Sequence, residues 1–221
     1  MPPKPIKFCA YCGVPATTKD HVPPKKVFLA PLPTDLITVP ACRKCNGGAS
    51  ADDRIFRNHL AIRVGGYRST GQARQFWTEG AMPSIRRKHG DLRHIATSAF
   101  PVTCYSPIGI YLGQGVGIPF NKDAHDRVVK RVVQGLYWHH FGEPLGMETP
   151  VSITFINTSR PNWLDSLRPV LQHLIVRRIG GEAFEYAYGR ATDAPLSSMW
   201  LLNFYRRHVV LADTNYAIEQ G

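Results

Sequence analysis

Four cysteines constrain this chain of 221 residues more than any other feature. They form two C-x-x-C pairs, Cys9 with Cys12 and Cys42 with Cys45, and 29 residues separate the pairs. Each pair offers two thiolates from one tight turn, and four thiolates complete the tetrahedral coordination of structural zinc. Residues 9–48 are also dense in glycine and proline, as expected of a small fold stapled by a metal. The spacing therefore predicts one structural Zn²⁺ whose coordination is closed to chemistry.

A strong positive charge accompanies the cysteines. The chain has 27 Lys and Arg against 16 Asp and Glu, a net charge of +11. Residues 1–75 hold 12 of the basic and 4 of the acidic residues, so most of the excess lies beside the cysteines. Because basic surfaces attract polyanions, a nucleic acid is the expected partner. A merely soluble basic protein is the alternative that charge alone leaves open.

The sequence also bears on location. It has no apolar run of about 18 residues, the length that a membrane-spanning helix needs, so we expect no membrane partner. The N-terminus, MPPKPIKFCAYC, has lysines and prolines but no apolar stretch of the kind found in secretory signals. Paired C-x-x-C motifs without such a signal favour metal binding over disulfides, and we expect a cytoplasmic protein. The fifth cysteine, Cys104, lies in an apolar stretch and is expected to be a lone buried thiol.

A polar cluster near the cysteines has the residue types of a catalytic site. Asp20 and His21 are neighbours in TTKDHVPP, and Asn46 directly follows the last cysteine of the pairs. Neighbours in a strand point to opposite faces, but at a strand end or bend both can flank one ion. Asp20 and Asn46 would supply oxygen ligands to a divalent cation such as Mg²⁺, and His21 would stay free as a general base. The zinc would hold this cluster rigid.

In their order, these motifs resemble the HNH endonuclease family in its four-cysteine zinc subtype. The resemblance rests on CAYCG, TTKDHVPP, VPACRKCN and SADD, and it covers about residues 6–64. It implies the ββα-metal fold, a two-strand ribbon and a helix around one metal ion. It also implies that Asp20 and Asn46 bind the catalytic cation, and that His21 activates the water that hydrolyses a phosphodiester.

One stretch departs from the family pattern. The family often has an asparagine a few residues before the second cysteine pair, where it helps to hold the loop of the ribbon. Here residues 34–40 read TDLITVP, without an asparagine. Asp35 or Thr38 is the candidate substitute, and the departure concerns the support of the loop rather than the chemistry.

The expected function is therefore that of a metal-dependent endonuclease, with DNA as the preferred substrate. Two other classes stay open: a zinc-ribbon protein that binds nucleic acid without cutting it, and a protein-interaction module that uses the zinc as a scaffold. Neither has a reason to place a base beside two oxygen ligands. Basic side chains near the cluster are the candidates for binding backbone phosphates: Lys25, Lys26, Arg43, Lys44, Arg54 and Arg57.

The chain as a whole predicts an α+β fold, in which a small zinc-stapled HNH module precedes a larger α+β region. We divide it into the zinc-containing module at 1–66, a basic linker with some helix at 67–95, and an α+β domain at 96–221. No catalytic motif is evident in the last segment. We expect it to supply substrate choice or the contacts of a homodimer, because a compact HNH module grips only a short stretch of backbone.

The sequence pattern also predicts individual elements. A helix should begin with Ser50 as its N-cap and end at Gly65, with Asp52 and Asp53 at the end that the helix dipole favours for acids. Further elements follow from apolar periodicity and glycine-rich turns: helices over 122–141 and 162–176, strands within 96–120 and over 151–156, and paired strands over 182–190 and 199–212.

Overall fold

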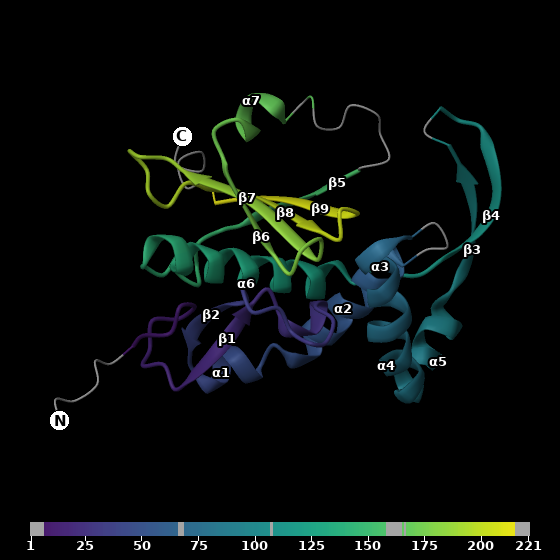
Figure 1. Ribbon diagram of the computed structural model, residues 1–221, viewed down its shortest axis with the longest axis horizontal. Helices are drawn as coiled ribbons and strands as arrows, with labels where there is room; N and C mark the ends of the chain where they lie inside the picture. The colour runs from purple at the N-terminus through teal and green to yellow at the C-terminus, as the bar shows by residue number, and fades with distance from the viewer. Residues whose placement is uncertain (1–6, 66–68, 107, 158–164, 166, 215–221) are drawn as a thin grey trace.

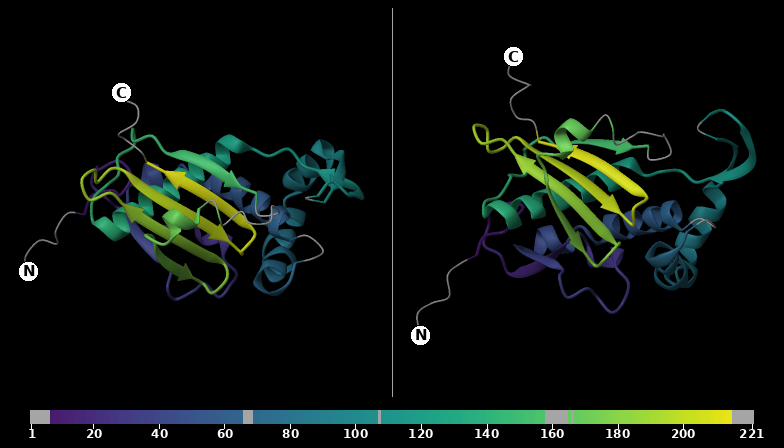
Figure 2. Two further views of the ribbon diagram at one scale, coloured as in Figure 1. Left: turned by 90° about the horizontal axis from the view of Figure 1, so that it is seen from above. Right: turned by 45° about the horizontal axis from the view of Figure 1, so that its top comes forward.

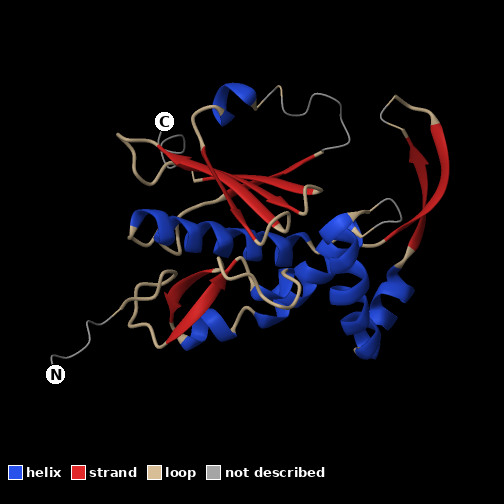
Figure 3. Ribbon diagram, in the orientation of Figure 1, coloured by secondary structure: helices blue, strands red, loops and turns tan. Residues whose placement is uncertain are grey.

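The computed structural model describes residues 7–65, 69–106, 108–157, 165 and 167–214. These residues form three layers, with one long helix between a small N-terminal ribbon and a larger sheet (Figure 1). Figure 3 shows the same arrangement by secondary structure, mixed helix and strand, as an α+β fold requires. No helix among the described residues is both long and apolar enough to cross a membrane.

The N-terminal layer has the order strand, strand, helix. Strands β1 and β2 pair antiparallel, with Asp20 opposite Val39 and His21 opposite Thr38. Two helices follow the ribbon directly, and the second begins and ends within a residue of the predicted span. The bounds are β1 Thr18–Val22, the 3-10 turn η1 Lys25–Val27, β2 Ile37–Ala41, α1 Arg43–Gly47 and α2 Ser50–Val64.

The start of α2 differs from the prediction in one respect. Ala49 is the N-cap and makes no side-chain capping bond, so Ser50 is the first helical residue. Asp52 and Asp53 do lie in the first turn. Their carboxylates, however, pair with two arginines of the helix in the middle layer, and this contact ties the first layer to the second.

The middle layer is α6, Lys122–Phe141, which confirms the helix predicted over 122–141. Its valines and leucine are buried on several sides, because it packs against α2 and the ribbon on one side and against the sheet on the other. Gly135 permits the closest approach. A Cβ at that position would lie 2.5 Å from the Val22 side chain of β1, so only glycine lets α6 come this near to the ribbon.

The third layer is a five-stranded antiparallel sheet with the strand order β5-β9-β8-β7-β6. It confirms strands at 151–156 and 182–190, and it resolves 199–212 into two strands. The helix predicted over 162–176 is largely wrong in its described part, where α7 is short and β6 begins at Ile175. The bounds are β5 Ser152–Ile156, α7 Arg168–Leu171, β6 Ile175–Ile179, β7 Phe184–Arg190, β8 Ser198–Phe204 and β9 His208–Asp213.

The segment that we interpreted as a basic linker is mostly helix. Phe76 and Ile85 are buried there and belong to the same hydrophobic core as the ribbon and the sheet. Scattered arginines hid this apolar periodicity in the sequence. The boundaries at 66 and 95 therefore do not separate independent cores. The bounds are α3 Gly71–Gln75, the π-helical turn η2 Phe76–Ala81, α4 Met82–Arg87 and α5 His89–Ser98.

A β-hairpin joins α5 to α6. This hairpin confirms the strands predicted within 96–120. It consists of β3, Phe100–Tyr105, and β4, Tyr111–Gly117. Cys104 lies on β3 with its sulfur 2.8 Å from the place where a Cβ of Gly115 would be. This thiol is only partly buried, less than predicted, because the hairpin extends away from the core.

Candidate metal centre and active site

The four predicted zinc ligands come together. The Sγ atoms of Cys9, Cys12, Cys42 and Cys45 all lie within 4.8 Å of one another. The sulfurs of Cys12 and Cys42 are 3.8 Å apart, and a tetrahedron with Zn–S bonds of about 2.3 Å has edges of about 3.8 Å. The four thiols therefore fit one tetrahedral metal ion such as Zn²⁺, and no other group of this kind occurs among the described residues.

Local backbone geometry favours thiolates at this centre. The Cys45 backbone N–H donates to Cys42 Sγ at 3.4 Å, and this hydrogen bond lowers the pKa of the Cys42 thiol to about 7. The same contact makes Cys42 the N-cap of α1. Burial raises the pKa of the Cys45 thiol, so a metal ion must displace a proton from it on binding.

The first cysteine pair is connected to Asp20 through a single side chain. Tyr11 lies between Cys9 and Cys12, and its hydroxyl donates to Asp20 Oδ2 at 2.8 Å. Burial raises the pKa of Tyr11, and the charge of Asp20 raises it further, so the phenol keeps its proton and remains a donor. Asp20 is itself buried. The turn formed by Cys9 and Cys12, which we call the first knuckle, thus fixes the position of the Asp20 carboxylate.

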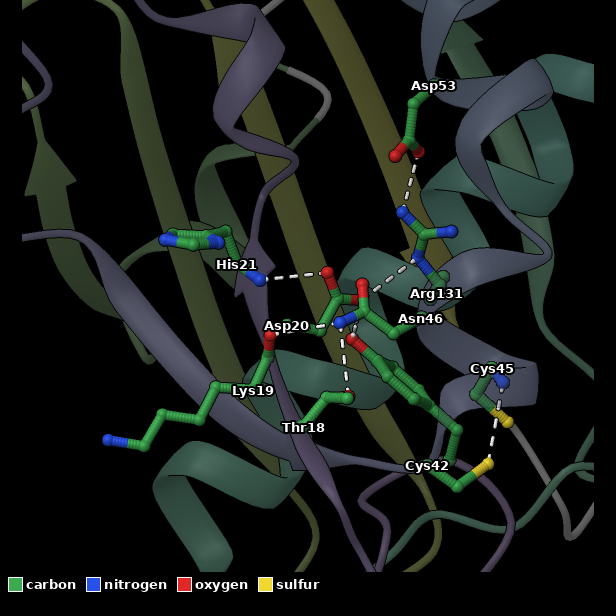
Figure 4. A network of polar contacts seen from close by, with 10 residues as sticks. Thr18, Lys19, Asp20, His21, Cys42, Cys45, Asn46, Asp53 and Arg131 are labelled. Atoms are coloured by element: carbon green, nitrogen blue, oxygen red, sulfur yellow. Dashed lines mark hydrogen bonds and ion pairs between the residues drawn. The ribbon is translucent and has the colours of Figure 1, made fainter.

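The second cysteine pair is connected to the same strand through Asn46. This residue follows Cys45 in α1, and its Nδ2 donates to Thr18 Oγ1 at 3.1 Å and to the carbonyl oxygen of Lys19 at 3.0 Å. Both acceptors belong to β1 and immediately precede Asp20. The first knuckle and the second, formed by Cys42 and Cys45, therefore hold the side chains of Asp20 and Asn46 next to each other (Figure 4).

Arg131 of α6 is the member of the cluster that sequence reasoning missed. Its guanidinium lies between two carboxylates, with Nη2 at 2.6 Å from Asp53 and Nε at 3.5 Å from Asp20 (Figure 4). Burial raises the pKa of Asp53, and Arg131 counteracts that shift. Asp20 and Arg131 are 111 positions apart in the sequence, so no local pattern could connect them.

We predict that Arg131→Met destabilises the protein by about 3 kcal/mol, because it leaves two largely buried carboxylates without their cation. In a chain of this size, that loss lowers the melting temperature by roughly 6–12 °C. Thermal unfolding followed by circular dichroism measures it. Adding Asp53→Asn to Arg131→Met should recover part of the loss, since one of the unpaired charges is then gone.

Arg127→Met is the matched control. Arg127 also pairs with an acid of α2, Asp52, at 2.7 Å, but its side chain is 60% exposed. Exposed ion pairs contribute at most about 1 kcal/mol, so this variant should melt close to the wild type. Equal melting temperatures for the Arg127 and Arg131 variants would contradict the role given to Arg131.

His21 lies on the other side of β1 from the Asp20 carboxylate. Its ring points away from that carboxylate, whereas its backbone N–H donates to Asp20 Oδ1 at 2.9 Å (Figure 4). The strand alternation therefore persists through these two residues, and the bend that would bring both side chains onto one ion is absent. Lys19 points to the same side of β1 as His21 and is exposed. It was not among the phosphate-binding residues predicted from the sequence.

The six predicted phosphate-binding residues separate into two groups. Arg57 is buried, and it donates to Asn58 Oδ1, so it is not available to a phosphate. Arg54 is partly exposed and pairs with Asp91 of α5. Asn58, the acceptor for Arg57, donates in turn to the same Asp91. The exposed candidates that remain are Lys25, Lys26, Arg43 and Lys44.

The loop of the ribbon is supported by the C-terminal layer. The carboxylate of Asp35 accepts hydrogen bonds from the backbone N–H of Gly180 at 3.2 and 3.3 Å. The hydroxyl of Tyr205 donates to the carbonyl oxygen of Val27 at 2.5 Å. Asp35 thus helps to hold the loop, although it does so through the β6–β7 turn. Thr38 is exposed on β2.

No protein-family model matches the chain, no curated protein matches it in sequence, and no solved structure matches it. The geometry and chemistry of the site itself therefore carry the functional assignment.

Proposed function

We propose that this protein is a metal-dependent endonuclease of the HNH type that hydrolyses phosphodiester bonds of nucleic acid, preferably DNA. One observation carries the proposal: the two cysteine pairs hold Asp20 of β1 and Asn46 of α1 beside each other, through the Tyr11 hydroxyl and through the Asn46 amide. The positive charge concentrated in the first third of the chain supports a polyanionic substrate.

The oxygen atoms at this place suit a hard divalent cation. Asn46 uses both hydrogen bonds of its Nδ2 on β1, and none of the described residues donates to its Oδ1. Asp20 Oδ1 accepts only the His21 backbone N–H from the described residues, so a lone pair is left for a metal ion. Asp20 and Asn46 would hold this cation, which would neutralise the charge that develops on the phosphate and its leaving oxygen.

We assign His21 the role of general base in an in-line displacement. In such a displacement, the attacking water and the leaving oxygen lie on opposite sides of the phosphorus. His21 accepts the proton of the water as the water oxygen bonds to phosphorus, and the bond from phosphorus to the leaving oxygen breaks. The exposed ammonium of Lys19 on the same side of β1 holds a phosphate oxygen.

A zinc-ribbon protein that binds nucleic acid without cutting it is the second candidate. One observation favours it: Arg131 already supplies a positive charge beside Asp20, which is the charge that a bound cation would otherwise supply. In this alternative, the ion pairs of Asp20 and Asp53 are purely structural.

Incubation of supercoiled plasmid with the protein in Mg²⁺ or Mn²⁺, against a chelated control, separates the two candidates. The nuclease predicts nicked and linear products only when a divalent cation is present. The zinc content of the chelated sample must be measured and must be unchanged, so that lost activity reports the catalytic cation alone. A retarded plasmid with no nicking in any metal would support the binding protein and overturn the nuclease.

A further inference from the structure

An uncharged hairpin extends from the body of the molecule (Figures 1 and 2). It consists of β3, β4 and the turn between them, and we call it the arm, residues 100–117 without residue 107. Among the described strands, β3 and β4 pair only with each other, so each leaves one backbone edge unpaired. Exposed edges of this kind readily pair with another chain.

The arm differs in charge from the rest of the protein. From Ile95 to Asn121 there is no Asp, Glu, Lys, Arg or His, although 19% of the whole chain is charged. A segment that grips phosphates would need basic side chains, and this one has none. The arm is therefore not part of the surface that attracts nucleic acid, and it suits an apolar partner.

The arm also exposes an unusual amount of apolar surface. Seven of its large side chains are between 48% and 79% exposed. A whole aromatic side chain has about 150–250 Å² of surface and an aliphatic one somewhat less, so the exposed fractions of the seven together present roughly 800 Å². The largest apolar patch of a typical monomer is about 300–600 Å². The seven are Phe100, Tyr105, Ile108, Ile110, Tyr111, Leu112 and Val116.

We propose that the occupant of this surface is the arm of a second copy of the chain, in a two-fold homodimer. A standard protein interface buries about 800 Å² on each partner, which the exposed side chains of one arm can supply. Two chains of net charge +11 repel each other, and a contact between uncharged arms avoids bringing the basic surfaces together. Pro101 lacks an N–H in β3, so β4 has the more complete edge for pairing across the two-fold axis.

Sedimentation velocity of the full-length protein tests the proposal. We expect the wild type to sediment as a dimer with twice the monomer mass of 24.7 kDa. Leu112→Glu with Val116→Glu should sediment as a monomer, because four carboxylates would then be desolvated in the interface. Both positions are exposed in the single chain, so circular dichroism should show an unchanged fold. Met147→Glu alters an exposed apolar residue outside the arm and should remain dimeric.

Two results would overturn the proposal. The first is a wild type that stays monomeric up to about 100 µM, a concentration at which even a weak specific dimer forms. The second is a double variant that remains a dimer, which would move the interface to another surface. A monomeric wild type that co-sediments with neutral phosphatidylcholine vesicles, and loses this binding in the double variant, would assign the arm to a lipid surface instead.

Discussion

Cys45→Ser should remove the zinc and unfold the N-terminal layer. Zinc held by four cysteines contributes about 10–16 kcal/mol to the folding of small zinc-bound peptides, more than a two-strand ribbon can replace with its own core. In hydrogen exchange, the backbone amides of β1 and β2 should lose protection first. Those of the β5–β9 sheet should keep more of their protection. Emission spectrometry should find one zinc per wild-type chain and markedly less in the variant.

Cys104→Ser is the matched control, because this cysteine lies in the arm, away from the cluster of four sulfurs. It should bind zinc and melt like the wild type. A wild-type zinc content well below one per chain, or equal zinc in the two serine variants, would contradict the metal centre. Tyr11 lies between the first two cysteines, and Asn46 directly follows the last one. Loss of zinc should therefore displace both residues and also abolish cleavage.

His21→Ala should lower the rate of phosphodiester cleavage at least ~100-fold, the usual contribution of a general base. The ring of His21 is not packed against the Asp20 carboxylate, so the alanine variant should keep its fold and its affinity for DNA. Initial rates of plasmid nicking at saturating Mg²⁺, together with a binding assay on the same plasmid, give the two quantities.

His173→Ala is the control for the loss of an imidazole as such, because His173 is exposed and lies before β6 in the C-terminal layer. Its rate should equal that of the wild type. If both alanine variants cut at the wild-type rate, His21 is not the base. If His21→Ala loses DNA binding and cleavage together, the residue is a contact to the substrate instead of a general base.

The parts of the site that the sequence predicts are those that depend on local spacing. The two C-x-x-C pairs identify four candidate metal ligands without reference to the fold, and the sequence places Asn46 directly after the last of them. The helix over 122–141 follows from apolar periodicity over five turns, a signal that tertiary packing rarely reverses.

The parts that the sequence does not predict depend on which surfaces meet. Arg131 reaches Asp20 only because Gly135 lets α6 approach the ribbon, and no local pattern encodes that approach. Arg57 is a residue type that binds phosphate, but its side chain is buried and donates to Asn58. Periodicity also fails for residues 71–98, where short helical turns interrupted by π-helix and proline bury only a few residues each.

The most direct test of the nuclease assignment is the Mg²⁺-dependent nicking rate of wild-type protein and Asp20→Asn, measured side by side at equal zinc content. Asparagine keeps the shape of the side chain and an oxygen for the Tyr11 hydroxyl, while it removes the charge that attracts the cation. We predict nicking by the wild type and a rate lower by at least ~100-fold in the variant. Equal rates in the two proteins, or no nicking by the wild type in any divalent metal, would contradict the assignment.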